Sequence, residues 1–239
     1  MLSDQKVSEE LRLMGRPKEE RLTQDVAREA CQRAGGKAFL MGFISSLGTH
    51  YVIGLKALNC NTGEVLGSEQ VEADSREHVL KALDESATKM REKLGESLAT
   101  IQKYDAPVEA TTPSLEALKA YSLGMKTWHS KGEDAALPFF QRAVELDPKF
   151  AMSFARMGNV YMHIPGEDAL GRENLRRAYE LRGKVTERER LYIEAHYYDS
   201  VTGELEKAVR VYEVWQQTYP RDIEPYQNLS GIYPRVQQE

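Results

Sequence analysis

Features that would commit this chain to a membrane or to nucleic acid are missing from its sequence. None of its hydrophobic runs approaches the roughly 18 to 20 apolar residues of a membrane-spanning helix, and residues 1–20 are too charged to be a signal peptide. The formal net charge is -5, from 32 basic and 37 acidic side chains. The sequence therefore lacks the basic excess that predicts binding to nucleic acid or to an anionic membrane.

Cysteine is also scarce, since Cys31 and Cys60 are the 2 cysteines of the chain. A single pair in 239 residues is no disulfide framework. We interpret both as small buried apolar side chains. The alternative is a disulfide between them, which would indicate an oxidising compartment. No second Cys or His stands at ligand spacing near either one, so we predict no metal site.

Motifs for catalysis are absent as well. A kinase needs a glycine-rich phosphate loop, an HRD-type loop and a DFG metal ligand, and the sequence contains none of them. Gly35-Gly36-Lys37 lacks the spacing of a P-loop and is interpreted as a turn that ends a helix. The 5 histidines are scattered without an HExxH pair, and no GxSxG elbow occurs. We predict that these residues form no enzyme and bind no cofactor.

What the sequence does contain is a pattern that begins at Ala117 and ends at Asp147-Pro148. Gly124 and Ala143 are small where two antiparallel helices would touch, and Phe140 would fill the space between them. The proline ends the second helix. These positions resemble those of a tetratricopeptide repeat (TPR), a helix pair that recurs about every 34 residues.

The pattern recurs along the rest of the chain. A second copy begins at Ala151 and needs one residue inserted near Pro165-Gly166, and a third runs from Glu189 to Pro220 with His196 in place of glycine at position eight. A fourth begins at Ile223 and stops with its first helix. The sequence therefore predicts an all-α TPR solenoid over residues 114–239, of about three and a half repeats and truncated at its end.

The first half has a different pattern. Helices are predicted over 3–12 and from a Thr23 N-cap to Gly35-Gly36. Three runs, 38–45, 51–59 and 64–71, are rich in aromatic and β-branched residues and are joined by short turns, which predicts an antiparallel meander. Asp74 and Glu77 suggest a capping box before a long amphipathic helix that extends to Ile101. We predict an α+β domain, a three-stranded sheet with helices, over 1–103, and a linker over 104–113.

The segments GGKAFLMGFI and YVIGLKALNCNTGEVL resemble the small α/β domain at the amino terminus of TolB. Such a domain followed by TPRs resembles the carboxy-terminal region of bacterial serine/threonine kinases or of CadC-like regulators. The resemblance implies a non-catalytic regulatory or sensor region of a bacterial signalling protein, extracytoplasmic and membrane-anchored, with a cytoplasmic location as the alternative. It also implies that the opening strand of the first domain is missing.

TPRs bind a partner segment along the face formed by their first helices. By repeat position, the residues predicted to line this groove are Tyr121, Met125, Trp128, Arg156, Asn159, Arg190 and Tyr197. Large rigid aromatic side chains there would act as contact anchors. The alternative is that Trp128 and Met125 pack against the first domain. A carboxylate clamp for chaperone tails is rejected, because Tyr121 and Met125 occupy the positions of its basic residue and asparagine.

We therefore predict a protein or peptide as partner, with a preference for acidic peptides near Arg156 and Arg190 as the finer hypothesis. A different hypothesis is a small-ligand sensor, in which the α/β domain holds the ligand and the TPRs serve as a dimerisation scaffold. A third treats the repeats as an assembly surface alone. The sequence leaves a homodimer open and does not identify the partner.

Overall fold

The computed structural model describes residues 4–17, 20–95, 111–220 and 222–236. The chain divides into two compact units at about residue 110. The first, the α/β unit, contains a sheet and helices, and the second, the helical unit, contains helices throughout its described part. Among the described residues, no helix is both long and apolar enough to cross a membrane. The predicted helix end at Leu98 to Ile101 and most of the predicted linker, 104–110, lie outside the described residues.

The α/β unit begins with two short helices. Their bounds, and those of the three strands and the helix that follow, are α1 (Asp4–Leu13), α2 (Gln24–Arg33), β1 (Ala38–Leu47), β2 (His50–Asn59), β3 (Val65–Ala73) and α3 (Val79–Lys93). The strands form one antiparallel sheet in the order β1-β2-β3. This confirms the predicted meander, because the short connections at 48–49 and 60–64 allow only neighbouring strands to pair.

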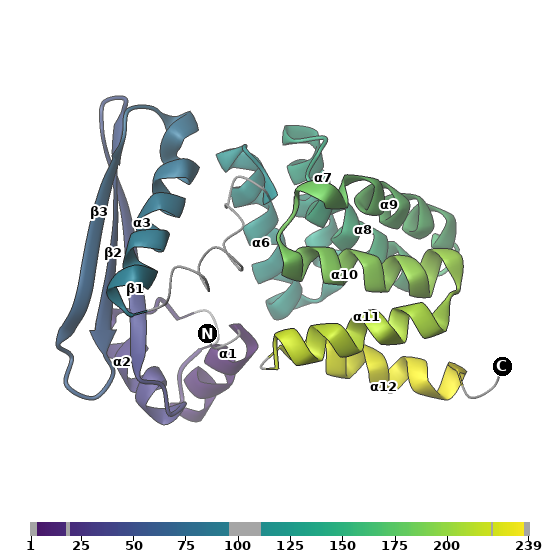
Figure 1. The fold of residues 1–239 in the computed structure, drawn as a ribbon, viewed down its shortest axis with the longest axis horizontal. Coiled ribbons are helices and arrows are strands. Elements are labelled where there is room, and N and C mark those ends of the chain that lie inside the picture. Colours follow the sequence, from purple (N-terminus) through teal and green to yellow (C-terminus); the bar gives the residue numbers. More distant parts are fainter. Residues whose placement is uncertain (1–3, 18–19, 96–110, 221, 237–239) are drawn as a thin grey trace. The chain divides into compact units, whose positions relative to one another are not determined.

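Helix α3 runs along one face of the sheet and contacts β2 and β3 (Figure 1). Ile53, Ala57 and Ala73 from the strands are buried, as are Val79 and Met90 from the helix. The hydrophobic side chains of the sheet and of α3 therefore form the core of this unit.

Local signals at the helix ends are partly as predicted. The Thr23 hydroxyl accepts a hydrogen bond from the Val26 amide, which confirms the N-cap of α2. The predicted capping box at Asp74 and Glu77 is wrong. Residues Arg76–His78 form a 3-10 turn, α3 begins after it without a side-chain cap, and the Asp74 carboxylate contacts His78 Nδ1 at 2.5 Å instead.

The interpretation of the two cysteines as separate buried side chains is also wrong. Cys31 of α2 and Cys60, directly after β2, form a disulfide, with their Cα atoms 5.8 Å apart. The side chains of Arg28 and Gln32, also on α2, donate hydrogen bonds to the Cys60 carbonyl. The helix is thus held to the end of the strand both covalently and by hydrogen bonds, a proximity that the 29-residue separation in sequence does not reveal.

The helical unit consists of consecutive helices that pair along the chain (Figure 1). Their bounds are α6 (Leu115–Lys131), α7 (Glu133–Leu146), α8 (Ala151–His163), α9 (Asp168–Leu181), α10 (Glu187–Tyr197), α11 (Leu205–Thr218) and α12 (Glu224–Val236). The pairs are α6 with α7, α8 with α9, and α10 with α11, and α12 packs on α11. The predicted all-α solenoid of helix pairs is confirmed.

Small residues lie where the paired helices approach each other. A Cβ atom added at Gly124 of α6 would come within 2.6 Å of the Phe140 ring of α7, and one at Gly158 of α8 within 2.7 Å of Leu175 of α9. Phe140, Ala143 and Leu175 are fully buried. The glycine positions of the repeat are therefore required by the close approach of the helices.

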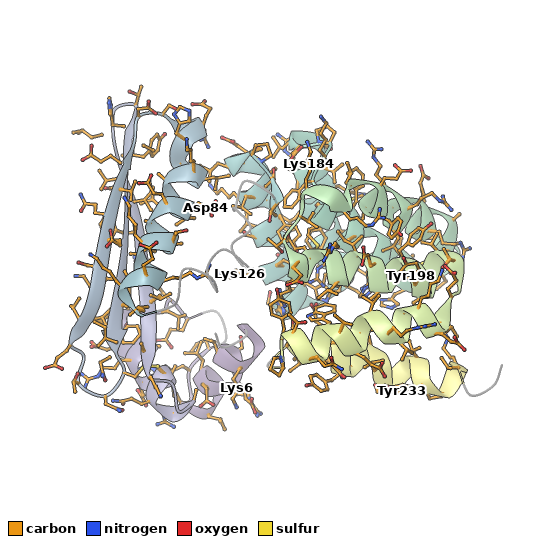
Figure 2. All side chains as sticks on the ribbon, in the orientation of Figure 1. Lys6, Asp84, Lys126, Lys184, Tyr198 and Tyr233 are labelled. Atoms are coloured by element: carbon orange, nitrogen blue, oxygen red, sulfur yellow. A yellow bond between two sulfur atoms is a disulfide. The ribbon has the colours of Figure 1, made fainter. Side chains whose placement is uncertain are left out.

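The third helix pair differs from the first two. After α10, Tyr198–Thr202 continues as a short π-helical turn, which ends at Gly203 with a φ of 71°. Tyr198 and Tyr233 are labelled on the ribbon in Figure 2. Tyr198 and Tyr179 of α9 share a hydrogen bond of 3.1 Å between their hydroxyl groups. The π-helical turn before α11 is thus anchored to the preceding repeat.

Candidate functional site

The most polar buried region of the helical unit surrounds Arg156 of α8. The side chain of this residue is 8% exposed, and its guanidinium Nη1 donates to Glu224 Oε1 of α12 at 2.8 Å. The guanidinium also lies over the ring of Tyr192 of α10, 4.1 Å from its centroid, and 5.5 Å from the ring centroid of Trp128 of α6. Arg156 therefore connects the first helices of four successive repeats.

Asn159, one turn further along α8, extends this arrangement. Its side-chain Nδ2 donates to the Tyr192 hydroxyl at 2.9 Å and to His196 Nε2 at 3.1 Å. The opposite ring nitrogen, His196 Nδ1, lies 2.9 Å from the Tyr192 carbonyl oxygen. We refer to Trp128, Arg156, Asn159, Tyr192, His196 and Glu224 as the Arg156 cluster.

The electrostatics of the cluster follow from its burial. Burial raises the pKa of Tyr192 to about 12, so the phenol remains neutral. Burial also lowers the pKa of His196, which favours a neutral imidazole that donates from Nδ1 and accepts at Nε2. Burial raises the pKa of Glu224, but the positive charges of Arg156 and Arg188 lower it by more than burial raises it. The pKa of Glu224 is therefore below its usual value. The cluster thus holds one buried ion pair among neutral groups.

One hydrogen-bond donor of the cluster has no acceptor. Arg156 Nε is buried and lacks a hydrogen-bond partner among the described residues. A buried donor that makes no hydrogen bond costs about 1–3 kcal/mol of stability, and a charged donor costs more. The donor is closed to solvent, so an oxygen atom from a bound molecule reaches it only after the surrounding side chains shift.

Four of the seven predicted groove residues meet here. Trp128, Arg156 and Asn159 belong to the cluster, and Tyr121 interacts with Arg156 while its ring packs against Phe140 and Phe150. Trp128 also contacts Phe140 of its own unit, with ring centroids 5.9 Å apart. Tyr121 and Trp128 are half-buried, so each presents part of its surface.

The other three predicted residues make different contacts. Met125 packs against the smaller apolar cluster around Phe140 and Met157. Tyr197 stacks on Tyr179 of α9, with ring centroids 3.8 Å apart, and Arg190 is exposed on α10. Met125 thus shares its apolar neighbours with Tyr121 and Trp128, whereas Tyr197 packs toward α9 and Arg190 faces solvent.

Sequence reasoning missed three contributors. Tyr192 and His196 stand at the repeat positions expected to pack against a partner helix, which conceals their polar role. Glu224 is 68 residues from Arg156, and the one signal in the sequence is an acidic residue at the start of the last helix. Arg188 joins them by contacting Asp222 at 2.6 Å and Glu224 at 3.8 Å.

One recess of the helical unit lies apart from this cluster. A recess of about 430 Å³ lies along α9 and is lined by charged and polar side chains together with Phe154 and Leu170. The described residues contain no group of three or more His, Cys, Asp or Glu side chains that could hold a metal ion. The Arg156 cluster therefore stands out through its unpaired donor and its half-buried aromatic rings.

Comparison with known proteins adds little. No protein-family model and no curated protein sequence matches the chain. Among solved structures, the chain is similar to the first TPR of Spaghetti (RPAP3), whose structure holds the HSP90 peptide SRMEEVD. The similarity has a TM-score of 0.38 and 18% sequence identity, and it covers 52% of this chain and 97% of that one. The helix pairs are established by the packing of this chain itself.

Proposed function

We propose that the helical unit binds an extended segment of a partner protein at the Arg156 cluster. The observation that carries this proposal is the buried Arg156 Nε, a charged donor without an acceptor among the described residues. Carboxylate and carbonyl oxygens are the acceptors that a guanidinium prefers. Because this donor is closed to solvent, the proposal includes a shift of the side chains that cover it, after which an acidic side chain of the partner segment supplies the oxygen atom.

The surroundings of Arg156 favour a peptide over a small ion. Trp128 and Tyr121 offer half-buried aromatic surface beside the guanidinium. Such side chains contribute strongly to binding when a partner removes them from water. A segment that combines an acidic group with apolar side chains would contact both kinds of surface, whereas an isolated anion would use the guanidinium alone.

We also propose the wider setting of this binding unit. Its order, an α/β domain before helical repeats, supports a regulatory region of a bacterial signalling protein such as a serine/threonine kinase. The disulfide between Cys31 and Cys60 supports an oxidising, extracytoplasmic compartment. Sequencing of the gene upstream tests this setting: kinase motifs followed by a membrane helix in the same reading frame are expected, and a different upstream domain would contradict it.

Binding is tested by fluorescence polarisation with the full chain and two labelled probes. One is a Gly-Ser peptide with tryptophan and a central run of glutamates, and the other carries glutamines in place of the glutamates. We expect saturable binding of the glutamate peptide, and Arg156→Lys should weaken it about tenfold, the equivalent of about 1.4 kcal/mol. Lysine keeps the positive charge near Glu224 but lacks the Nε donor.

The matched control is Arg142→Lys, because Arg142 is an exposed arginine of α7 that pairs with Glu145. It should bind like the unaltered chain. Arg190→Gln provides a second test that does not disturb a buried group, and it should weaken binding if the peptide extends along α10. Equal affinity for both probes, or unaltered binding by Arg156→Lys, would contradict the proposal.

A further inference from the structure

The sheet of the α/β unit has two edge strands of opposite character. β3 carries Glu69 and Glu72, and charged side chains of this kind protect an edge against pairing with another strand. β1, with the sequence AFLMGFISSL, contains neither a charged residue nor a proline. Among the described residues, its outer edge pairs with no other strand. β1 thus lacks the protection that β3 has.

Several large apolar side chains of β1 are exposed to solvent. Leu40 is 50% exposed, Ile44 55% and Leu47 85%. Helix α3 contacts β2 and β3, and α2 contacts β1 near Ala38. An apolar recess of about 220 Å³ lies beside it, lined by residues that include Gly42, Ile44, Ile53 and Leu83. Exposed apolar surface next to an open strand edge indicates a protein interface.

The backbone groups available for pairing can be identified from the register. Lys37 lies opposite Cys60, and the Cys60 amide donates to the Lys37 carbonyl oxygen at 3.1 Å. Because an antiparallel ladder alternates, odd-numbered residues of β1 bond to β2 and even-numbered residues direct their N–H and C=O groups outward. The outward set is Ala38, Leu40, Gly42, Ile44 and Ser46.

We propose that β1 pairs antiparallel with β1 of a second copy of this chain, with a two-fold axis at Gly42. In this register Gly42 faces Gly42 of the second copy, Leu40 faces its Ile44, and Ala38 faces its Ser46. Leu40, Gly42 and Ile44 then exchange backbone hydrogen bonds with the second copy, whereas the Ala38 carbonyl oxygen already lies 3.5 Å from Cys31 Sγ of α2. The result is one continuous sheet of six strands, a common size for a β-sheet.

The side chains of β1 are complementary to themselves in this register. Leu40 of the second copy lies against Ile44, beside the apolar recess, and Met41 faces Phe43 of the second copy on the opposite face of the sheet. Contacts between methionine sulfur and an aromatic ring are favourable. No like charges meet along the strand, because β1 has none. The same operation on β3 would bring glutamates of the two copies together.

The test is the oligomeric state of the full chain, measured by size-exclusion chromatography with light scattering over a dilution series. The unaltered protein is expected to be a dimer. Leu40→Lys and Ile44→Glu should each raise its dissociation constant at least about tenfold, since each places a charge against an apolar side chain of the second copy. The double variant should restore the dimer, because the side chains introduced by Leu40→Lys and Ile44→Glu have opposite charges and then face each other across the interface.

Leu66→Lys is the matched control, since Leu66 is 46% exposed on β3, the other edge strand. It should leave the dimer unchanged, and circular dichroism verifies that every variant is folded. A monomeric unaltered protein would overturn the proposal. A dimer that persists in Leu40→Lys would also overturn it, because dimerisation through the helical unit predicts that result. A double variant whose dimer is as weak as those of the single variants would overturn it as well.

Discussion

His196 occupies the position in the third helix pair where the first two pairs have Gly124 and Gly158. An imidazole in this place is enclosed by Tyr192 and Tyr212 and is 5% exposed. It accepts a hydrogen bond from Asn159 at Nε2, which requires the neutral ring. A residue that departs from the repeat pattern thus becomes part of the buried polar cluster.

The stability of the helical unit should depend on pH through this residue. Burial lowers the pKa of His196 in the folded state, whereas the unfolded value is about 6.5. Above pH 6.5 both states are neutral and the contribution is fully present. As the pH falls below 6.5 and through the lower folded pKa, the unfolded state binds the proton first, and stability is lost.

Urea unfolding at several pH values between about 7.5 and 5 measures this effect. Trp128 and Trp215 both belong to the helical unit, so tryptophan fluorescence reports its unfolding alone. His196→Gln should lower stability at neutral pH and make it less sensitive to pH in this window. Parallel pH profiles of the variant and the unaltered chain would show that His196 is not the responsible group.

At the scale of elements, the crossing of α8 and α9 depends on two glycines. A Cβ atom at Gly158 would lie 3.0 Å from the Gly171 carbonyl oxygen, and one at Gly171 would lie 2.6 Å from Met162 Sδ. Backbone atoms of one helix therefore contact those of the next. This close approach holds α8, the helix that carries Arg156 and Asn159, against the second helix of its repeat.

Gly158→Ala should destabilise the helical unit by about 1–3 kcal/mol, the usual cost of overpacking. Intrinsic helix propensity alone predicts the opposite change, because it favours alanine over glycine by about 1 kcal/mol. Gly231→Ala in α12 is the matched control, because a Cβ atom there meets nothing within 4 Å. It should be neutral or stabilising. Thermal unfolding followed by tryptophan fluorescence compares the two, and equal effects would refute the packing argument.

At the scale of the whole molecule, the two units differ in what stabilises them. The helical unit is held by an extended apolar core that includes Phe150, Tyr212 and Trp215. The α/β unit has one small sheet, with a helix along one face, and a disulfide that joins α2 to the end of β2. A small unit with limited apolar burial gains proportionately more from a covalent link.

Reduction of the disulfide should therefore destabilise the α/β unit. Closing a loop of 29 residues corresponds to about 3–4 kcal/mol in the chain-entropy model. Hydrogen exchange of the full chain, with and without dithiothreitol, should show faster exchange in α2 and in β1 to β3. Tryptophan fluorescence monitors the helical unit in the same samples. Unchanged exchange in α2 after reduction would contradict this expectation.

The sequence by itself determined the alternation of the strands and the spacing of the helix pairs. Both follow from local chemistry: side chains of a strand point to alternate faces, and small residues must recur wherever paired helices approach. Thr23 capping α2 and Gly124 facing Phe140 are local in the same sense. Repeat positions assign Tyr121, Trp128 and Asn159 to one face, and their role in a groove stays a prediction.

Only the tertiary structure decided which distant residues meet. The Cys31 to Cys60 disulfide and the Arg156 to Glu224 ion pair join residues 29 and 68 positions apart. No local pattern encodes such pairs, because they depend on how strands and repeats stack after they form. The position of Tyr197 against Tyr179, separate from the Arg156 cluster, has the same origin. The packing of α2 against the sheet and of each repeat against the next determines these contacts. This packing exists only in the folded chain.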